Sequence, residues 1–172
     1  MIHARKIAIS ALVCAMLIAV QYVFSAVKGV ELVTVFFFAF CFSFGAWYGI
    51  TVAVCYSLLR CFLFGFFPNV TILYLVYYTL FAVVAAVVGR IFSNKSKMAK
   101  LIASTLSAIL LVIVFSLLDD LITPIVYSYN GKQWQIYIYQ SLPVMLTQGI
   151  SAAVSTLLLF LPLEKVFARV KK

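Results

Sequence analysis

The segment Leu32–Phe67, LVTVFFFAFCFSFGAWYGITVAVCYSLLRCFLFGFF, decides the fold, because the number of membrane crossings depends on how this segment is divided. Near its middle, Gly45-Ala46-Trp47-Tyr48-Gly49 predicts a turn. Glycine permits a tight reversal of the chain, and Trp and Tyr favour the membrane interface. We therefore predict two short helices, over residues 32–46 and 49–66, which require tilt or local thinning of the bilayer.

The composition of the whole chain predicts that lipid is its solvent. Of 172 residues, 66% are apolar and only 10% are charged, outside the range of water-soluble domains. A helix that crosses the hydrocarbon core takes roughly 20 residues, so the length allows about six crossings. The net charge of +9 lies in short clusters between apolar runs. This pattern indicates membrane orientation and argues against nucleic-acid binding.

Three basic clusters determine the parity of the crossings. Basic segments face the cytoplasm, so an even number of helices must separate one cluster from the next. We predict an all-α protein of the bacterial inner membrane, with a single domain over residues 1–172 and both termini in the cytoplasm. The clusters are Arg5 and Lys6; Arg90, Lys95, Lys97 and Lys100; and Lys165, Arg169, Lys171 and Lys172. The six predicted spans cover residues 7–27, 32–46, 49–66, 70–91, 101–126 and 142–161.

The last external segment is predicted to be Tyr127–Ser141. It contains an Asn130-Gly131 turn signal flanked by aromatic residues. This pattern predicts a small hairpin or an ordered cap on the external face.

Charged residues in or beside the apolar runs are candidate site residues, because an ionised group inside a membrane is costly and usually functional. Arg60 lies about 11 residues into the 49–66 helix, roughly 16 Å from its inner end and so in the outer half of the bilayer. Its side chain either extends to the outer headgroups or faces the bundle interior and pairs with Asp119, Asp120, Glu31 or an anionic ligand. The two adjacent aspartates point about 100° apart, so at most one faces inward, and water at the external mouth is the alternative environment.

Aromatic residues gather on the same predicted side. Tyr74, Tyr77 and Tyr78 have the i, i+3, i+4 spacing of one helix face. They form either part of an interfacial aromatic belt or a surface on which a flat ligand stacks. The same alternatives apply to the aromatic residues of the last external segment, which are Tyr127, Tyr129, Trp134, Tyr137 and Tyr139.

A stripe of alanines marks the first span. Such small residues let another helix approach closely, either within this bundle or from a separate membrane subunit. The stripe consists of Ala4, Ala8, Ala11, Ala15 and Ala19.

Sequence motifs for catalysis are missing from the chain. It has no G-x-x-x-x-G-K-[ST] loop for a nucleotide, no H-E-x-x-H and no Ser-His-Asp set, so we expect neither an enzyme nor a cofactor. The four cysteines lie in apolar runs without metal-ligand spacing, and we interpret them as packing residues.

The alanine stripe of A-x-x-x-A type, the turn Phe44–Gly49 and the external aromatic and charged residues together resemble the substrate-binding S components of energy-coupling factor (ECF) transporters. The likeness covers almost the whole chain. It implies a subunit that captures a vitamin-like micronutrient from outside. It also implies that transport requires a transmembrane coupling subunit and two ATPase subunits, which hydrolyse the ATP.

The resemblance further implies where the substrate and the coupling subunit bind. Third spans of vitamin-specific relatives often carry Asp or Asn near the outer end, whereas this chain has Arg60, which suggests an anionic ligand. Two alternatives are a stand-alone small secondary transporter and a non-transporting protein of the cell envelope. The substrate-contacting residues implied are Glu31, Arg60, Tyr74, Tyr78, Asp120, Trp134 and Tyr137. The residues implied to face the coupling subunit are Ala4, Ala8, Ala11 and Ala15.

Overall fold

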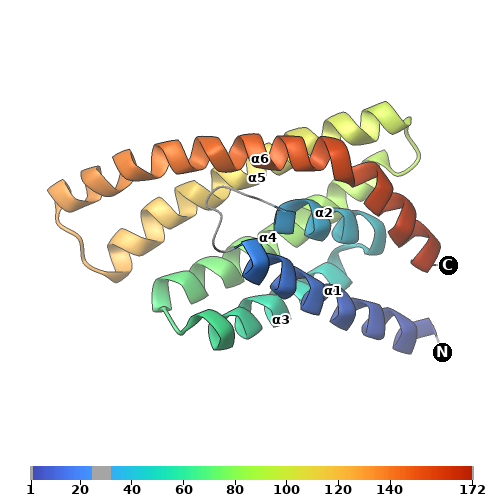
Figure 1. Ribbon diagram of the computed structural model, residues 1–172, viewed down its shortest axis with the longest axis horizontal. Coiled ribbons are helices and arrows are strands. Elements are labelled where there is room, and N and C mark those ends of the chain that lie inside the picture. The colour runs from blue at the N-terminus through green and yellow to red at the C-terminus, as the bar shows by residue number, and fades with distance from the viewer. Residues whose placement is uncertain (1, 25–31, 172) are drawn as a thin grey trace.

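The computed structural model describes residues 2–24 and 32–171, and within these ranges every regular element is an α-helix (Figure 1). Five of these helices, all except α2, are long and apolar enough to cross a membrane. The predictions of an all-α fold and of a multi-pass membrane protein are confirmed. The helices are α1 (Ile2–Phe24), α2 (Leu32–Phe44), α3 (Ala46–Phe64), α4 (Pro68–Phe92), α5 (Lys97–Val126) and α6 (Gly131–Lys171).

The short helix α2 lies at the centre of the bundle. The other helices pack in the order α1, α3, α4, α5, α6, each against the next, and α2 contacts all five. Ten of its 13 residues are buried. At 1.5 Å per residue α2 is about 20 Å long, whereas the hydrocarbon core is about 30 Å thick. Because α2 is enclosed by protein, it needs neither the tilt nor the bilayer thinning that the sequence suggested.

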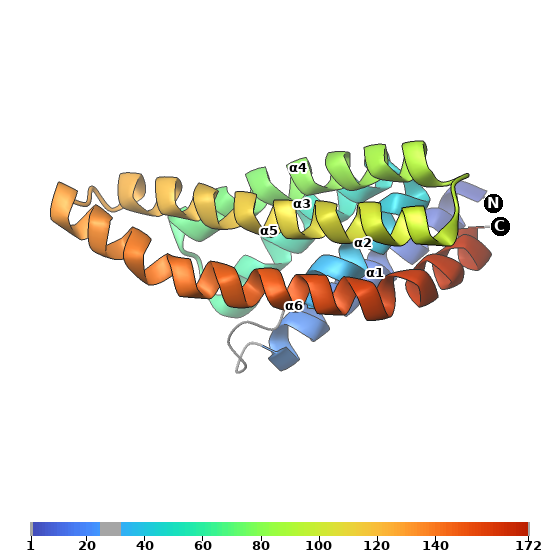
Figure 2. The same ribbon diagram turned by 90° about the horizontal axis from the view of Figure 1, so that it is seen from above.

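The two ends of the bundle differ in what they contain. One end, here called the terminal end, holds the start of α1, the end of α6 and the α2–α3 and α4–α5 connections (Figures 1 and 2). The opposite end, the distal end, holds the α3–α4 and α5–α6 connections, and the α5–α6 hairpin extends beyond the rest of the bundle there. The described residues of the three basic clusters therefore lie together at the terminal end.

The packing of α2 against α4 is close enough to require glycine. A Cβ atom on Gly89 would lie 2.4 Å from the carbonyl oxygen and 2.9 Å from the Cα of Phe42. Around this contact the core is built from aromatic rings in edge-to-face contact. The ring of Phe160 on α6, for example, lies 5.9 Å from that of Phe38 and 5.2 Å from that of Phe42, centroid to centroid.

The predicted turn over Gly45–Gly49 is reduced to one residue. Gly45 alone interrupts the helices, with a positive φ of 88° that favours glycine, and α3 begins at Ala46. Gly49 instead lies inside α3, where a Cβ atom would be 2.8 Å from the Sγ of Cys41. Sequence analysis assigned both glycines to the turn, because the sequence alone does not distinguish a glycine needed for a turn from one needed for close packing.

A small hairpin over Tyr127–Ser141 is not formed, because α6 begins at Gly131 and not at residue 142. The backbone N–H of Gln133 donates to Oδ1 of Asn130, and the N–H of Asn130 donates to Oε1 of Gln133, both at 2.9 Å. This reciprocal capping box satisfies amide groups at the helix start. The resulting 41-residue helix is about 60 Å long, which explains why the α5–α6 hairpin projects at the distal end.

We expect Gly89→Ala to lower the stability of the bundle by about 1–3 kcal/mol, because the methyl group must displace the backbone of α2. Gly149→Ala is a matched control, since no atom lies within 4 Å of its Cβ position. That variant should keep or slightly raise the stability, as alanine favours helix. The check is the midpoint of thermal unfolding of both purified proteins in detergent. Equal midpoints would show that the α2–α4 contact is not tight.

Candidate functional site

The distal half of the bundle lacks the central helix, because α2 occupies only the half next to the terminal end (Figure 1). A small cavity of about 70 Å³ lies where α2 begins, and Thr34 of α2 lines it together with residues of α4, α5 and α6. The short length of α2 therefore leaves room for a site in the distal half. The lining residues are Thr34, Tyr74, Tyr77, Tyr78, Val112, Phe115 and Gln148.

A second cavity of about 240 Å³ lies between α5 and α6. It shares Phe115 and Gln148 with the small cavity, so the two adjoin. We call them the distal cavities. The larger one is lined by Phe115, Ser116, Asp119, Tyr137, Gln140, Ser141, Val144 and Gln148.

The tyrosines of α4 face inward, where they form an aromatic wall. Tyr77 and Tyr78 are buried, and Tyr77 lies 4.8 Å from Phe115 of α5 between ring centroids. Tyr78 makes an edge-to-face contact of 4.9 Å with Tyr56 of α3. An interfacial belt would place these rings outward at the headgroups, so that alternative does not describe them.

A hydrogen-bonded bridge holds this wall against α1. The hydroxyl of Tyr56 donates to Oε1 of Gln21 at 2.5 Å, and Nε2 of Gln21 donates to the hydroxyl oxygen of Tyr74 at 3.1 Å. One amide thus links α1, α3 and α4. Gln21 was not among the residues proposed from sequence, although a glutamine inside an apolar span is a detectable signal.

Arg60 packs against aromatic rings and forms no ion pair with a described carboxylate. Its guanidinium carbon lies 4.2 Å from the ring centroid of Tyr74 and 5.2 Å from that of Phe64, at cation–π distance. The alternative in which Arg60 pairs with Asp119 or Asp120 is therefore excluded. Arg60 also lines neither distal cavity.

The two adjacent aspartates of α5 have different surroundings. Asp119 lines the larger cavity and accepts hydrogen bonds of 2.7 Å from Thr123 and from Tyr137. Asp120 is buried, and its Oδ2 accepts a 2.8 Å bond from Ser141, while no described group binds its Oδ1. Sequence reasoning favoured Asp120, but Asp119 is the aspartate that lines the cavity.

Further hydrogen bonds join the α5–α6 helical hairpin to α4. Thr123 accepts a 3.0 Å bond from the Nδ2 of Asn69, whose Oδ1 accepts a 3.1 Å bond from Tyr127. The indole N–H of Trp134 donates to the backbone oxygen of Asp120 at 3.0 Å. These contacts fix the distal ends of α4, α5 and α6 relative to one another.

The structure brings together most of the residues predicted from sequence. Tyr74 and Tyr78 line the small cavity and Tyr137 lines the large one, whereas Asp120 and Trp134 support its wall. Glu31 lies outside the described residues. Sequence reasoning missed five polar or aromatic residues that line the larger cavity besides Asp119, of which Gln148 was detectable as a polar residue within a predicted span. These five are Phe115, Ser116, Gln140, Ser141 and Gln148.

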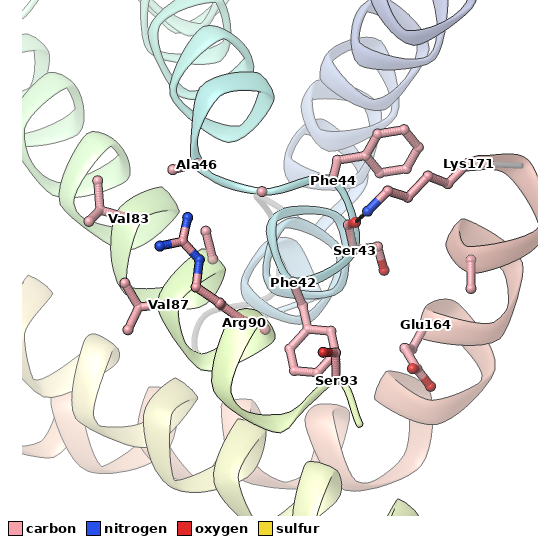
Figure 3. A pocket seen from close by; sticks show the side chains of 14 residues that line it. Phe42, Ser43, Phe44, Ala46, Val83, Val87, Arg90, Ser93, Glu164 and Lys171 are labelled. Carbon is pink, nitrogen blue, oxygen red and sulfur yellow. Dashed lines mark hydrogen bonds between the residues drawn. The ribbon is translucent and has the colours of Figure 1, made fainter. Parts of the chain in front are cut away.

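A larger cavity of about 670 Å³ lies at the terminal end. Figure 3 shows the guanidinium group of Arg90 between Val83 and Ala46, with Glu164 across the cavity on α6. Lys171 also lines it and donates to the backbone oxygen of Ser43 at 2.5 Å. None of the residues proposed from sequence as substrate contacts lines this cavity.

The alanine stripe does not pack inside the bundle. Ala4, Ala8, Ala11 and Ala15 are all exposed on α1, as is Ala19. The alternative in which the stripe serves contacts within this chain is therefore excluded for these side chains.

No family model, no curated protein and no solved structure matches this chain. The described residues also contain no group of three or more His, Cys, Asp or Glu side chains arranged to hold a metal ion. Function must therefore be argued from the geometry of the cavities.

We expect Tyr137→Phe to destabilise the protein by about 1.5–3 kcal/mol, because the hydroxyl makes a 2.7 Å bond to a carboxylate oxygen. Tyr139→Phe is the matched control, since Tyr139 lies two residues away and its side chain is 74% exposed. Thermal unfolding in detergent should separate the two variants. A Tyr137→Phe protein as stable as Tyr139→Phe would show that the contact contributes nothing net.

Proposed function

We propose that this protein is the substrate-binding S component of an ECF transporter, which captures a vitamin-like micronutrient from outside the cell. The observation that carries the proposal is the pair of adjoining polar and aromatic cavities at the end opposite the basic clusters. Ligand sites in proteins are typically concave, largely apolar and aromatic, with a few convergent polar groups, and the distal cavities have this character.

The orientation of the proposed site follows from charge. The described basic residues of the three clusters lie at the terminal end, and such residues are retained on the cytoplasmic side of a membrane. The proposal therefore places the terminal end in the cytoplasm and the distal cavities on the external side of a bacterial inner membrane. A water-soluble solute arriving from outside would meet the α5–α6 hairpin first.

The partners in this proposal are a transmembrane coupling subunit and two ATPase subunits. The exposed alanine stripe on α1 supports a contact with the coupling subunit, because small residues allow close approach of a second helix. Lipid chains would gain little packing energy from such a smooth stripe, whereas a second helix can pack closely against it. The ATPase subunits would supply the energy for uptake.

The proposed orientation predicts that a thiol at Lys97→Cys is closed to membrane-impermeant maleimide in intact cells and reacts after permeabilisation. A thiol at Lys132→Cys, near the start of α6, should react in intact cells. The four native cysteines provide the background, which is measured in the unmodified chain. Labelling of Lys97→Cys from outside would invert the topology and place the distal cavities in the cytoplasm.

Uptake assays test the function itself. Cells that express the chain with an energy-coupling module should accumulate the micronutrient that copurifies with it, and cells without the module should not. Ala8→Trp should abolish both uptake and copurification with the coupling subunit, because an indole blocks close helix approach. It should leave solute binding to the purified protein unchanged.

The control for bulk on a lipid-facing surface is Leu106→Trp on α5, where the leucine is 63% exposed. This variant should support normal uptake. Transport by the chain alone, without the module, would contradict the proposal and indicate a stand-alone secondary transporter.

A further inference from the structure

We infer that the ligand of the distal cavities is a planar ring that carries a positive charge. This inference rests on the proposed function and concerns its substrate class. It is opposite in sign to the anionic ligand that Arg60 suggested from the sequence.

The larger cavity contains a carboxylate without a counter-charge among its described lining residues. Asp119 is the only charged residue among the eight described residues that line the larger cavity. Its hydrogen-bond donors, Thr123 and Tyr137, are neutral hydroxyls. Within the described part of the chain the ion pair present joins Lys100 to Glu164, at the other end of the molecule. A partly buried carboxylate without a counter-charge is costly, and a cationic ligand would offset that cost.

A second carboxylate reinforces the first. Asp120 follows Asp119 directly, is only 9% exposed and has an Oδ1 atom without a described partner. Its other oxygen accepts a bond from Ser141, which itself lines the larger cavity. Two neighbouring carboxylates beside one cavity give it a negative potential, which favours a cation over a neutral or anionic ligand.

The aromatic rings that line the cavities favour a planar ligand. Phe115 lines both cavities, Tyr137 lines the larger, and Tyr74 and Tyr77 line the smaller. Aromatic faces attract cations through their quadrupole and offer flat surfaces for stacking. The amides of Gln140 and Gln148 add hydrogen-bonding groups that can orient a polar ring substituent.

Arg60 does not reverse this electrostatic argument. Its guanidinium group is held against the rings of Tyr74 and Phe64, and it lines neither cavity. An anionic ligand in the larger cavity would meet Asp119 with no basic side chain among the described lining residues. The sign of the electrostatic potential in the site is therefore determined by Asp119 of α5 and not by Arg60 of α3.

The experiment compares three ligands that share one ring and differ in charge: 1-methylnicotinamide, a cation methylated on the ring nitrogen; nicotinamide, which is neutral; and nicotinate, an anion. Binding to the purified full chain in lipid nanodiscs is measured by calorimetry. The cation should bind about tenfold more tightly than nicotinamide, and nicotinate should bind most weakly. Asp119→Asn should remove about tenfold from the affinity for the cation and change that for nicotinamide by less than about threefold.

Two controls separate charge from folding. Glu164→Gln removes a carboxylate at the terminal end and should leave all three affinities unchanged. Gln140→Lys places a positive charge in the cavity lining and should selectively weaken binding of the cation. Gln135→Lys is its control, because it places the same charge on a nearby exposed position outside the lining. Because Gln140 is exposed, its variant tests the inference even where Asp119→Asn fails to fold.

The outcomes distinguish failure of the inferred ligand charge from failure of the proposed function. Binding of nicotinamide or nicotinate as tight as that of the cation, weakened by substitutions in the cavity, would overturn the inferred charge and leave solute capture intact. Equal affinity of the cation for the unmodified chain and for Gln140→Lys would also overturn it, as would the absence of cation binding at millimolar concentration. The proposed function fails separately, by uptake that is independent of the coupling module.

Discussion

The close contact between Gly89 of α4 and the backbone of Phe42 is the constraint on which the rest of the structure depends, because it holds α2 inside the ring of other helices. In lipid, apolar side chains gain little from leaving the solvent, so close packing and dispersion must replace the hydrophobic effect between helices. Small residues and edge-to-face aromatic contacts provide that packing around α2. Since the enclosed helix is about 20 Å long, it fills one half of the bundle and leaves the other half open for the distal cavities.

Polar groups in the distal half are bound mainly to one another, as an apolar medium requires. The bridge through Gln21 ties α1, α3 and α4, and the bonds around Asp119 and Thr123 tie α4, α5 and α6. A hydrogen bond that is shielded from water is stronger, and an unpaired polar atom there is correspondingly costly. Polar side chains so arranged serve both to hold the helix ends and to line a cavity.

The sequence predicted the helices well because long apolar runs and basic clusters are sufficient to locate membrane spans. It could not predict that α2 is central, since a helix that is apolar on every side carries no periodicity to show which neighbours surround it. It missed the start of α6 because the turn signal at Asn130-Gly131 was given more weight than the capping pair of Asn130 and Gln133. For the site, residue types identified Tyr74, Tyr78 and Tyr137, but only packing shows that Asp119 lines the cavity and that Arg60 stacks on Tyr74.

The separation of charge along the molecule explains why a carboxylate site belongs at the distal end. Orientation in a membrane gathers basic residues at one end, and the cavity there is lined by Arg90 and Lys171. A carboxylate at that end is neutralised by its neighbours, as Glu164 is by Lys100 at 2.7 Å. At the distal end Asp119 has only hydroxyl donors, so its charge remains available to a ligand. The basic clusters at the terminal end thus lie too far along the molecule to pair with the carboxylate that lines the distal cavity.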